Sequence, residues 1–349
     1  MNNQRGNEEP TQEHGAVPRR TEVFTSAEMR SLTRRAWGPP MVRLGAQTLL
    51  YAAVVALPFF VDSWWLRVPA WIMAGIILAG LHSILHYCCH GTFVPGTRGN
   101  RVFGQVAGSL VLMNSALYRA FHLTHHRLTG EAGDPEPDGA FTRLRQYAFA
   151  MLNVDYIVAF ARMSVASLWH RYPDFVRSPR ERRAIRRDSL LLVAWVCLVA
   201  GATFLWPWVV LNVYLIPLVI AGTVNFLSAL PEHYYAERSG NPWRNTNSVY
   251  TRSVWFRFLY WNSNYHAEHH LFPGVPSWRL PQVSKRVKKY LSHTETSYVA
   301  FHRKLLSDLA SGRAALEEQP IGEGRRADFW YPLNKVADAN PSTGADVER

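Results

Sequence analysis

The chain has 349 residues, of which 48% are hydrophobic, and its formal net charge is +12. This length allows one large or two ordinary domains with a buried core, and three cysteines exclude a disulfide framework. The 13 tryptophans and 15 tyrosines are high counts. Both residues gather at membrane interfaces, where the ring is buried and its polar tip stays hydrated. These features favour an integral membrane protein.

The N-terminal part of the chain changes from polar to strongly apolar. Residues 1–25 are rich in Glu, Arg, Gln and Asn and lack periodicity, so we expect a disordered arm. In 26–43, arginines surround a few apolar residues, which is typical of a short interfacial helix at an anionic lipid surface. Apolar runs follow at 41–61 and 68–85, long enough to cross a hydrocarbon core of roughly 30 Å. The short connector 62–67 makes them a hairpin.

The middle of the chain combines shorter segments with two more long apolar runs. Residues 102–117 are apolar but interrupted by glycines and an asparagine, which favours a re-entrant or interfacial segment over a full span. Apolar positions recur at roughly helical spacing in 141–169, and 177–187 is a basic run. The runs 189–206 and 209–229 complete four predicted transmembrane helices.

The C-terminal part is predicted to be helical and then loosely held. We expect residues 277–315 to form a cytoplasmic helix with a basic patch at Lys285, Arg286, Lys288 and Lys289. This patch is either a solvated or lipid-facing stripe or a docking face for an acidic electron carrier. The chain therefore divides into the arm 1–25, a membrane domain 26–315 with a cytoplasmic helical cap, and a polar tail 316–349. The predicted fold class is an all-α integral membrane protein.

The arginines indicate the orientation in the membrane. Twelve arginines lie between Tyr118 and Asp188, whereas the two connectors on the opposite side hold only Arg67. Because short loops rich in Lys and Arg stay in the cytoplasm, the region between the second and third spans is predicted to be cytoplasmic. An even number of spans puts both termini on the same side. Membrane topology thus accounts for the excess positive charge, and we expect no nucleic-acid partner.

Ten of the fourteen histidines gather in four short segments at the ends of apolar runs, all on the predicted cytoplasmic side. Imidazole is the commonest metal-ligating side chain. His82 lies one helical turn deeper than the others and is expected to be a core or channel-lining residue. The candidate metal ligands are the other nine, namely His86, His90, His122, His125, His126, His233, His266, His269 and His270.

The spacing of these histidines predicts how they are shared between ions. Residues four apart share a helix face, which pairs His86 with His90 and His122 with His126. Adjacent residues on a helix diverge by about 100°, so His125 and His126 should face different ions, and the same holds for the adjacent pair in the last segment. Two ions are the simplest inference. Spacing alone does not choose among zinc, copper, iron and nickel, although nine ligands favour iron over four-coordinate zinc.

The three clusters resemble the histidine boxes of the membrane fatty acid desaturase and hydroxylase superfamily. That pattern is H-x(3,4)-H, H-x(2,3)-H-H and H-x(2)-H-H, and it is matched at 86–90, 122–126 and 266–270. The resemblance covers roughly residues 40–300. It implies a non-haem diiron centre that uses O2 to attack an unactivated C–H bond, with His233 as the extra ligand that follows the fourth span.

The sequences around the boxes also match, with one departure. Gly133-Asp-Pro135 follows the second box, and Leu271-Phe-Pro273 follows the third. Many desaturases have an aspartate after the first histidine of the first box, where this chain has Tyr87, so the surroundings of one iron are expected to differ. Ligating histidines usually donate their other N–H to a neighbouring polar group. The candidates for residues behind the ligands are His82, Asp134, Glu232, Asn264 and Glu268.

The resemblance implies a reaction class but leaves the product open. We expect desaturation of a fatty acyl chain; hydroxylation of a lipid or carotenoid, or oxidative decarboxylation to a terminal alkene, are alternatives. The run 262–266 also resembles carotenoid hydroxylases. Without a rubredoxin-type or haem-attachment motif, electrons are expected from a separate ferredoxin, rubredoxin or cytochrome-type donor on the cytoplasmic face. A membrane zinc hydrolase would hold zinc and ignore O2, and a metal transporter would need ligands within its spans.

Overall fold

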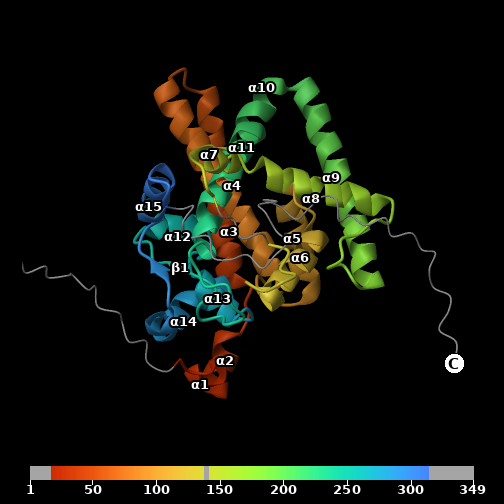
Figure 1. Cartoon of the computed structure of the whole chain (residues 1–349). Helices are drawn as coiled ribbons and strands as arrows, with labels where there is room; N and C mark the ends of the chain where they lie inside the picture. Colours follow the sequence, from red (N-terminus) through yellow and green to blue (C-terminus); the bar gives the residue numbers. More distant parts are fainter. Residues whose placement is uncertain (1–16, 137–140, 314–349) are drawn as a thin grey trace, which may run out of the picture.

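The computed structural model describes residues 17–136 and 141–313, shown in Figure 1. Helices dominate these residues. Across the two described ranges the only strands are β1 (Ser248–Val249) and β2 (Thr294–Glu295), which pair in parallel with Ser248 opposite Thr294. The predicted all-α class is therefore confirmed.

Four helical segments are long and apolar enough to cross a membrane, as predicted. Each begins earlier in the chain than its apolar run. The third shows the reason, because Ser178 and Glu181 form a capping box that starts the helix within the basic run. The segments are α3 (Gly38–Ala56) with η1 (Leu57–Phe59), α4 (Trp64–Cys89), α9 (Pro179–Leu205), and a fourth made of α10 (Pro207–Val210), η2 (Leu211–Leu215), α11 (Ile216–Ala229) and η3 (Leu230–Glu232).

Helix α4 is the central span. Within its apolar window 56% of the residues are buried, against 17% in the windows of α3 and α9, whose apolar side chains face outward. Helix α11 packs along α4 at Gly75, where a Cβ would clash with Ile220. At Gly80 a Cβ would clash with the carbonyl oxygen of Leu259, which belongs to a later segment of the chain. The outer spans thus present apolar surface to lipid, while α4 supports the interior.

The segment predicted at 102–117 is not one continuous element. It covers the end of α5 (Thr97–Leu110), a turn, and the start of α6 (Ser115–Leu128). The turn has Leu112 at φ 58°, and the side chain of Asn114 caps α6 by accepting a hydrogen bond from the amide of Leu117 at 2.9 Å. This cap begins a new helix, so the segment consists of two helices joined by a turn. Neither helix is among the candidate spans, as predicted, and the re-entrant or interfacial position stays a prediction.

Two further helices follow α6. They are α7 (Leu144–Ala150) and α8 (Val154–Leu168), within the region where helical spacing was predicted. The break between them falls at Asn153, which has φ 53°, and the two axes are bent by 51°. Together they are apolar enough for a broken span or a re-entrant pair.

The sequence predicts a disordered arm over residues 1–25, and this range is too long. Residues 1–16 lie outside the described ranges, but 17–25 are placed and include the short helix α1 (Arg20–Val23), which is followed by α2 (Ser26–Leu32). Phe24 is buried and packs edge-to-face on Phe272, with ring centroids 5.3 Å apart. One apolar anchor in a polar stretch fixes this part of the chain, and composition alone does not reveal it.

The C-terminal region contains several short helices instead of the predicted helix over 277–315. The break comes at 291–297, where β2 pairs with β1 and Ser297 caps the last helix by accepting from the amide of Ala300. The predicted tail 316–349 lies outside the described residues. The elements of this region are α12 (Val254–Leu259), α13 (His266–Leu271), η4 (Ser277–Arg279), α14 (Leu280–Val287), η5 (Lys288–Tyr290) and α15 (Tyr298–Ala310).

Candidate metal centre

Four separate segments bring the nine predicted ligands together. Helix α4 ends at the first box, with His86 in its last turn and His90 as its C-cap. Helix α6 carries the second box, α13 carries the third, and His233 follows directly after η3 at the end of the fourth span. All nine imidazoles fall into two groups, each with ring nitrogens within 4.8 Å of one another.

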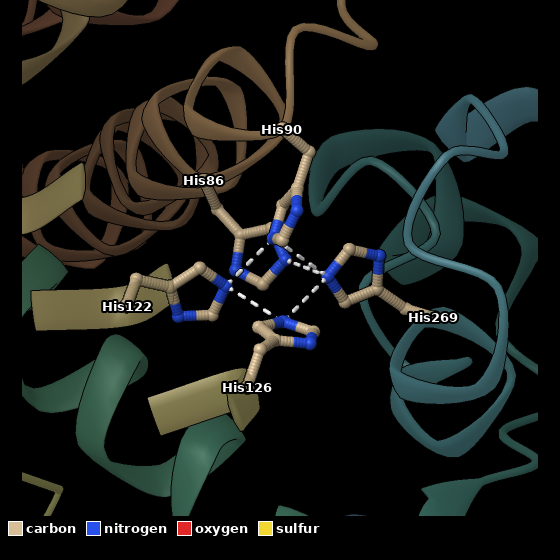
Figure 2. A group of neighbouring side chains, drawn as sticks. All are labelled: His86, His90, His122, His126 and His269. Carbon is tan, nitrogen blue, oxygen red and sulfur yellow. Dashed lines mark hydrogen bonds between the residues drawn. The ribbon is translucent and has the colours of Figure 1, made fainter. Parts of the chain in front are cut away.

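The first of these is the five-histidine group, made of His86, His90, His122, His126 and His269 (Figure 2). The Nε2 atom of His269 lies 2.7 Å from that of His86, 3.1 Å from that of His126 and 3.2 Å from that of His90. The Nε2 atom of His122 lies 2.9 Å from that of His90 and 3.0 Å from that of His126. These five contacts within the group all join Nε2 atoms around one point.

The second is the four-histidine group, made of His125, His233, His266 and His270. The Nε2 atom of His233 lies 3.2 Å from those of both His125 and His266. The two groups adjoin, because the ring of His270 stacks on that of His126 with centroids 3.9 Å apart. The adjacent histidines of the second and third boxes are divided between the groups, as the 100° divergence on a helix predicts.

Hydrogen bonding does not explain this arrangement of nitrogens. A neutral imidazole has one N–H, yet Nε2 of His269 meets three other Nε2 atoms. Metal binding does explain it. Two nitrogens each about 2.1 Å from one ion, and at right angles, are about 3.0 Å apart. The measured separations of 2.7 to 3.2 Å lie around this value, so both groups fit a transition-metal ion held by nitrogen ligands.

The rings are held in the neutral form that ligation needs. Burial lowers the pKa of His90 and of His233 to about 3. For His269 and His270, burial first and the neighbouring imidazoles second hold the pKa well below its usual value. A neutral ring keeps a nitrogen lone pair available, and metal binding requires that form.

Carboxylates stand behind the four-histidine group. The Nδ1–H of His125 donates to Asp134, with the Nδ1 to Oδ1 distance at 2.9 Å. The Nδ1 atom of His266 lies 3.4 Å from Oε1 of Glu232. A proton held on Nδ1 leaves the lone pair on Nε2, which faces the group, and a carboxylate makes the ring more basic. Two of the predicted candidates, Asp134 and Glu232, therefore lie next to the Nδ1 atom of a candidate ligand.

Three residues around this group were missed by the sequence prediction. The Nδ1–H of His233 donates to the carbonyl oxygen of Asn245 at 2.9 Å, and the hydroxyl of Thr129 lies 3.5 Å from Nδ1 of His270. Oε2 of Glu136 lies 3.5 Å from Nε2 of His125. Glu136 directly follows the Gly133-Asp-Pro135 turn, so the sequence offered a signal for this residue. No sequence pattern points to a backbone carbonyl such as that of Asn245.

The five-histidine group is supported by packing instead of carboxylates. Its rings make no hydrogen bond or ion pair to an acidic side chain within 17–136 and 141–313, and Nδ1 of His269 is buried without a hydrogen-bond partner. The ring of Tyr118 stacks on His122 with centroids 5.5 Å apart. Tyr87 packs edge-on against His86 and His269, at 5.1 and 5.7 Å. Tyr87, the departure from the usual box, therefore supports two rings by contact.

Two other predicted residues, His82 and Asn264, do not reach the rings, and neither does the nearby Arg119. The Nε2 atom of His82 is buried without a partner, and its ring packs edge-on against Tyr118 at 5.0 Å. The amide of Asn264 donates to the carbonyl oxygen of Val249 at 3.0 Å. The guanidinium of Arg119 donates to the carbonyl oxygen at the end of α4. These residues support the backbone or the core around the site.

Glu268 also turns away from the histidines that flank it on α13. Its carboxylate accepts hydrogen bonds from the hydroxyls of Tyr250, at 2.7 Å, and Ser248. The Ser248 hydroxyl oxygen in turn accepts from the amide of Ala267 at 3.0 Å. This buried network ties β1 to α13 and so fixes the helix that carries three ligands.

Four apolar helices and two adjoining groups of buried or partly buried imidazoles define a helical membrane protein with a histidine-rich candidate metal site. The model of the fatty acid desaturase family matches residues 62–302, which is well over half of the chain. The chain therefore belongs to the fatty acid desaturase family and is an oxidoreductase of that family.

Curated relatives agree with this assignment. The chain is 26% identical to the acyl-lipid omega-3 desaturase (cytochrome b5) of the endoplasmic reticulum of Arabidopsis thaliana, covering 69% of this chain and 68% of the relative. It is 25% identical to the sn-1 acyl-lipid omega-3 desaturase (ferredoxin) of Synechocystis sp., covering 77% and 81%. It is 24% identical to the sn-1 oleoyl-lipid 12-desaturase of Picosynechococcus sp., covering 76% and 81%.

Proposed function

We propose that this protein uses its nine clustered histidines to hold two iron ions and introduces a double bond into the fatty acyl chain of a lipid, in a reaction that consumes O2. The observation that carries the proposal is the convergence of nine Nε2-bearing rings into two adjoining groups. Membership of the desaturase family, and relatives that are named acyl-lipid desaturases, support the reaction class.

The chain itself contributes ligands, fixed tautomers and a dry site. Bound iron in these positions supplies the O2-dependent oxidation of an unactivated C–H bond. Asp134 holds the proton of His125 on Nδ1, and the carbonyl of Asn245 does the same for His233. Both rings therefore keep their Nε2 lone pair turned toward the four-histidine group.

An aromatic wall next to the site keeps water out. Tyr118, Phe121 and Phe160 are buried side chains of α6 and α8, and Phe121 meets Phe160 edge-on at 5.2 Å. Tyr118 joins this wall to the five-histidine group by stacking on His122. Buried rings on this side of the site shield it from water.

The proposed topology places the histidine groups on the cytoplasmic side. The connections after α3 and after α9 lie at one end of the molecule, and α13 and α14 lie at the other (Figure 1). The positive-inside rule assigns the second end to the cytoplasm. We take the membrane domain, from 26 onward, as one catalytic unit. Its electrons come from a separate carrier protein, which the names of two relatives also indicate.

Metal and product analysis together test the proposal. Purified protein should contain about two iron atoms per chain by mass spectrometry of the metals, and expression in a host without polyunsaturated lipids should add double bonds only when O2 is present. Lipids and pigments are both analysed, so a hydroxylated lipid or carotenoid, or a terminal alkene, would redirect the assignment. Zinc in place of iron, with a product that forms without O2, would refute it.

A further inference from the structure

We propose that the basic patch of Lys285, Arg286, Lys288 and Lys289 is the docking surface for a small acidic protein that delivers electrons one at a time. The inference rests on the proposed function. Forming one double bond removes two hydrogen atoms from the acyl chain and reduces O2 to two water molecules, which takes two further electrons and two protons. A one-electron carrier must therefore dock twice for each product.

The patch is an exposed surface that carries excess positive charge. Helix α14 buries Leu280, Val283 and Val287 in the core and exposes the opposite side, on which the basic residues of α14 and η5 lie. The guanidinium of Arg286 pairs with the carboxylate of Glu28. The other three basic side chains of the patch make no ion pair in the part of the chain that the structure describes. Three positive charges thus remain for a partner.

The position of the patch favours a soluble partner over lipid. Figure 1 places α14 beside α1 and α2, at the end of the molecule opposite α10 and the connection between α3 and α4. Those connections belong to the membrane hairpins. The patch therefore lies at the end of the molecule away from these connections (Figure 1). An acidic soluble protein matches both its charge and its place, and opposite charges also speed the encounter of such partners.

The patch is also close to the metal site. The ammonium of Lys288 lies 4.0 Å from the ring centre of Tyr250, whose hydroxyl donates to the carboxylate of Glu268 at 2.7 Å. Glu268 directly precedes His269, whose Nε2 meets three other ligands. One tyrosine and one carboxylate thus separate the surface from the five-histidine group. Electron transfer falls steeply with distance, so this short connection suits a carrier that docks on the patch.

The other strongly basic region has no such connection. The run 177–187 lies at the start of α9, where Arg182, Arg183 and Arg186 line a surface cavity with Tyr172. The guanidinium of Arg182 lies over the Tyr172 ring, with 5.4 Å to the centroid. Within the described residues, no hydrogen bond, ion pair or ring contact of these three arginines leads to a histidine of either group. This run carries the same kind of charge on a different face, so it provides a matched control.

The test uses iron-loaded protein in nanodiscs of phosphatidylcholine. The probes are a plant-type ferredoxin and the soluble domain of a cytochrome b5, both acidic, reduced and mixed anaerobically with the protein. Oxidation of the carrier is followed by its visible absorbance. The double variant K285E/K289E leaves the contact of Lys288 with Tyr250 in place, and R180E/R183E makes the same charge change on α9.

We expect K285E/K289E to raise the carrier concentration for the half-maximal rate at least tenfold and to change the maximal rate less than twofold. The control should shift neither value by more than twofold. Added salt should weaken carrier binding to the parent protein, because salt screens exposed charges. It should affect carrier binding to K285E/K289E much less. The docking surface would be overturned if K285E/K289E kept the half-saturating carrier concentration of the parent protein, or if the control variant shifted it equally. It would also be overturned if dithionite reduced the iron-loaded protein and neither carrier did.

A separate measurement tests the proposed function alone. Protein reduced by dithionite and then exposed to O2 needs no docking, so a single turnover on lipid should still give product in K285E/K289E. Failure of this turnover in the parent protein would refute desaturation, while the carrier measurements would still report on docking.

Discussion

The two histidine groups use the same ligand atoms, but the chain holds their rings in different ways. In the four-histidine group the Nδ1 atoms face Asp134, Glu232, Thr129 and the carbonyl oxygen of Asn245. In the five-histidine group the rings are held by Tyr87 and Tyr118, and Nδ1 of His269 has no hydrogen-bond partner. One group is fixed by hydrogen bonds and the other by packing.

This difference separates two sources of metal affinity. A carboxylate behind an imidazole fixes its tautomer and makes it a stronger ligand, so four rings with such support can hold an ion well. Five rings without that support depend on their number and on the contacts that orient them. We therefore expect the four-histidine group to be sensitive to its outer partners and the five-histidine group to be sensitive to the loss of a ligand.

The largest effect is expected for His269→Ala. This change removes the Nε2 atom that meets three others in the five-histidine group. Product formation should fall more than 100-fold, beyond the 10–100-fold that loss of an outer partner costs, and iron should fall from two to at most one per chain. Metal analysis and gas chromatography of the lipids measure both. A variant with full activity and no iron would end the proposed mechanism.

The next effect is expected for Asp134→Asn. It removes the charge behind His125, whose Nδ1 lies 2.9 Å from the carboxylate. Metal affinity and activity should fall about 10–100-fold, with one ion lost before the other in competition with a chelator. Asp174→Asn, at an exposed acidic residue with no such contact, provides the control. Equal losses in both variants would show that the carboxylate behind His125 has no special role.

A smaller effect is expected for Glu232→Gln. The distance of 3.4 Å between Oε1 and Nδ1 of His266 is longer than a strong charge-assisted hydrogen bond. Activity should fall less than about tenfold, at the lower limit for an outer partner. Kinetics at matched iron content measure the loss. A larger loss than that of Asp134→Asn would reverse the order of the two carboxylates.

The smallest effect on the metal site is expected for His82→Asn. His82 lies on α4 one turn before His86, but it joins neither group. Iron should stay at two per chain, and unfolding should become easier by about 1 kcal/mol, as for an average substitution. Metal analysis and thermal unfolding test this. Loss of an ion would place His82 among the ligands and end the division into five and four.

Parts of the fold could be predicted because their causes are local. Four long apolar runs give four spans, and the 100° step between neighbouring helix residues divides His125 from His126. Other parts have distant causes. Phe24 orders its segment by packing on Phe272, and β2 interrupts the predicted C-terminal helix because it pairs with β1. A window of neighbouring residues contains neither partner.

The sequence by itself determined the four apolar helices, the nine candidate ligands at their ends and the resemblance to the desaturases, because residue type and helical period are properties of short segments. Only the tertiary structure decided which rings share a group and what stands behind each. His86 and His269 meet although 183 residues separate them, and His233 finds the carbonyl oxygen of Asn245 in a loop. Such contacts depend on how the helices pack, and no local pattern encodes them.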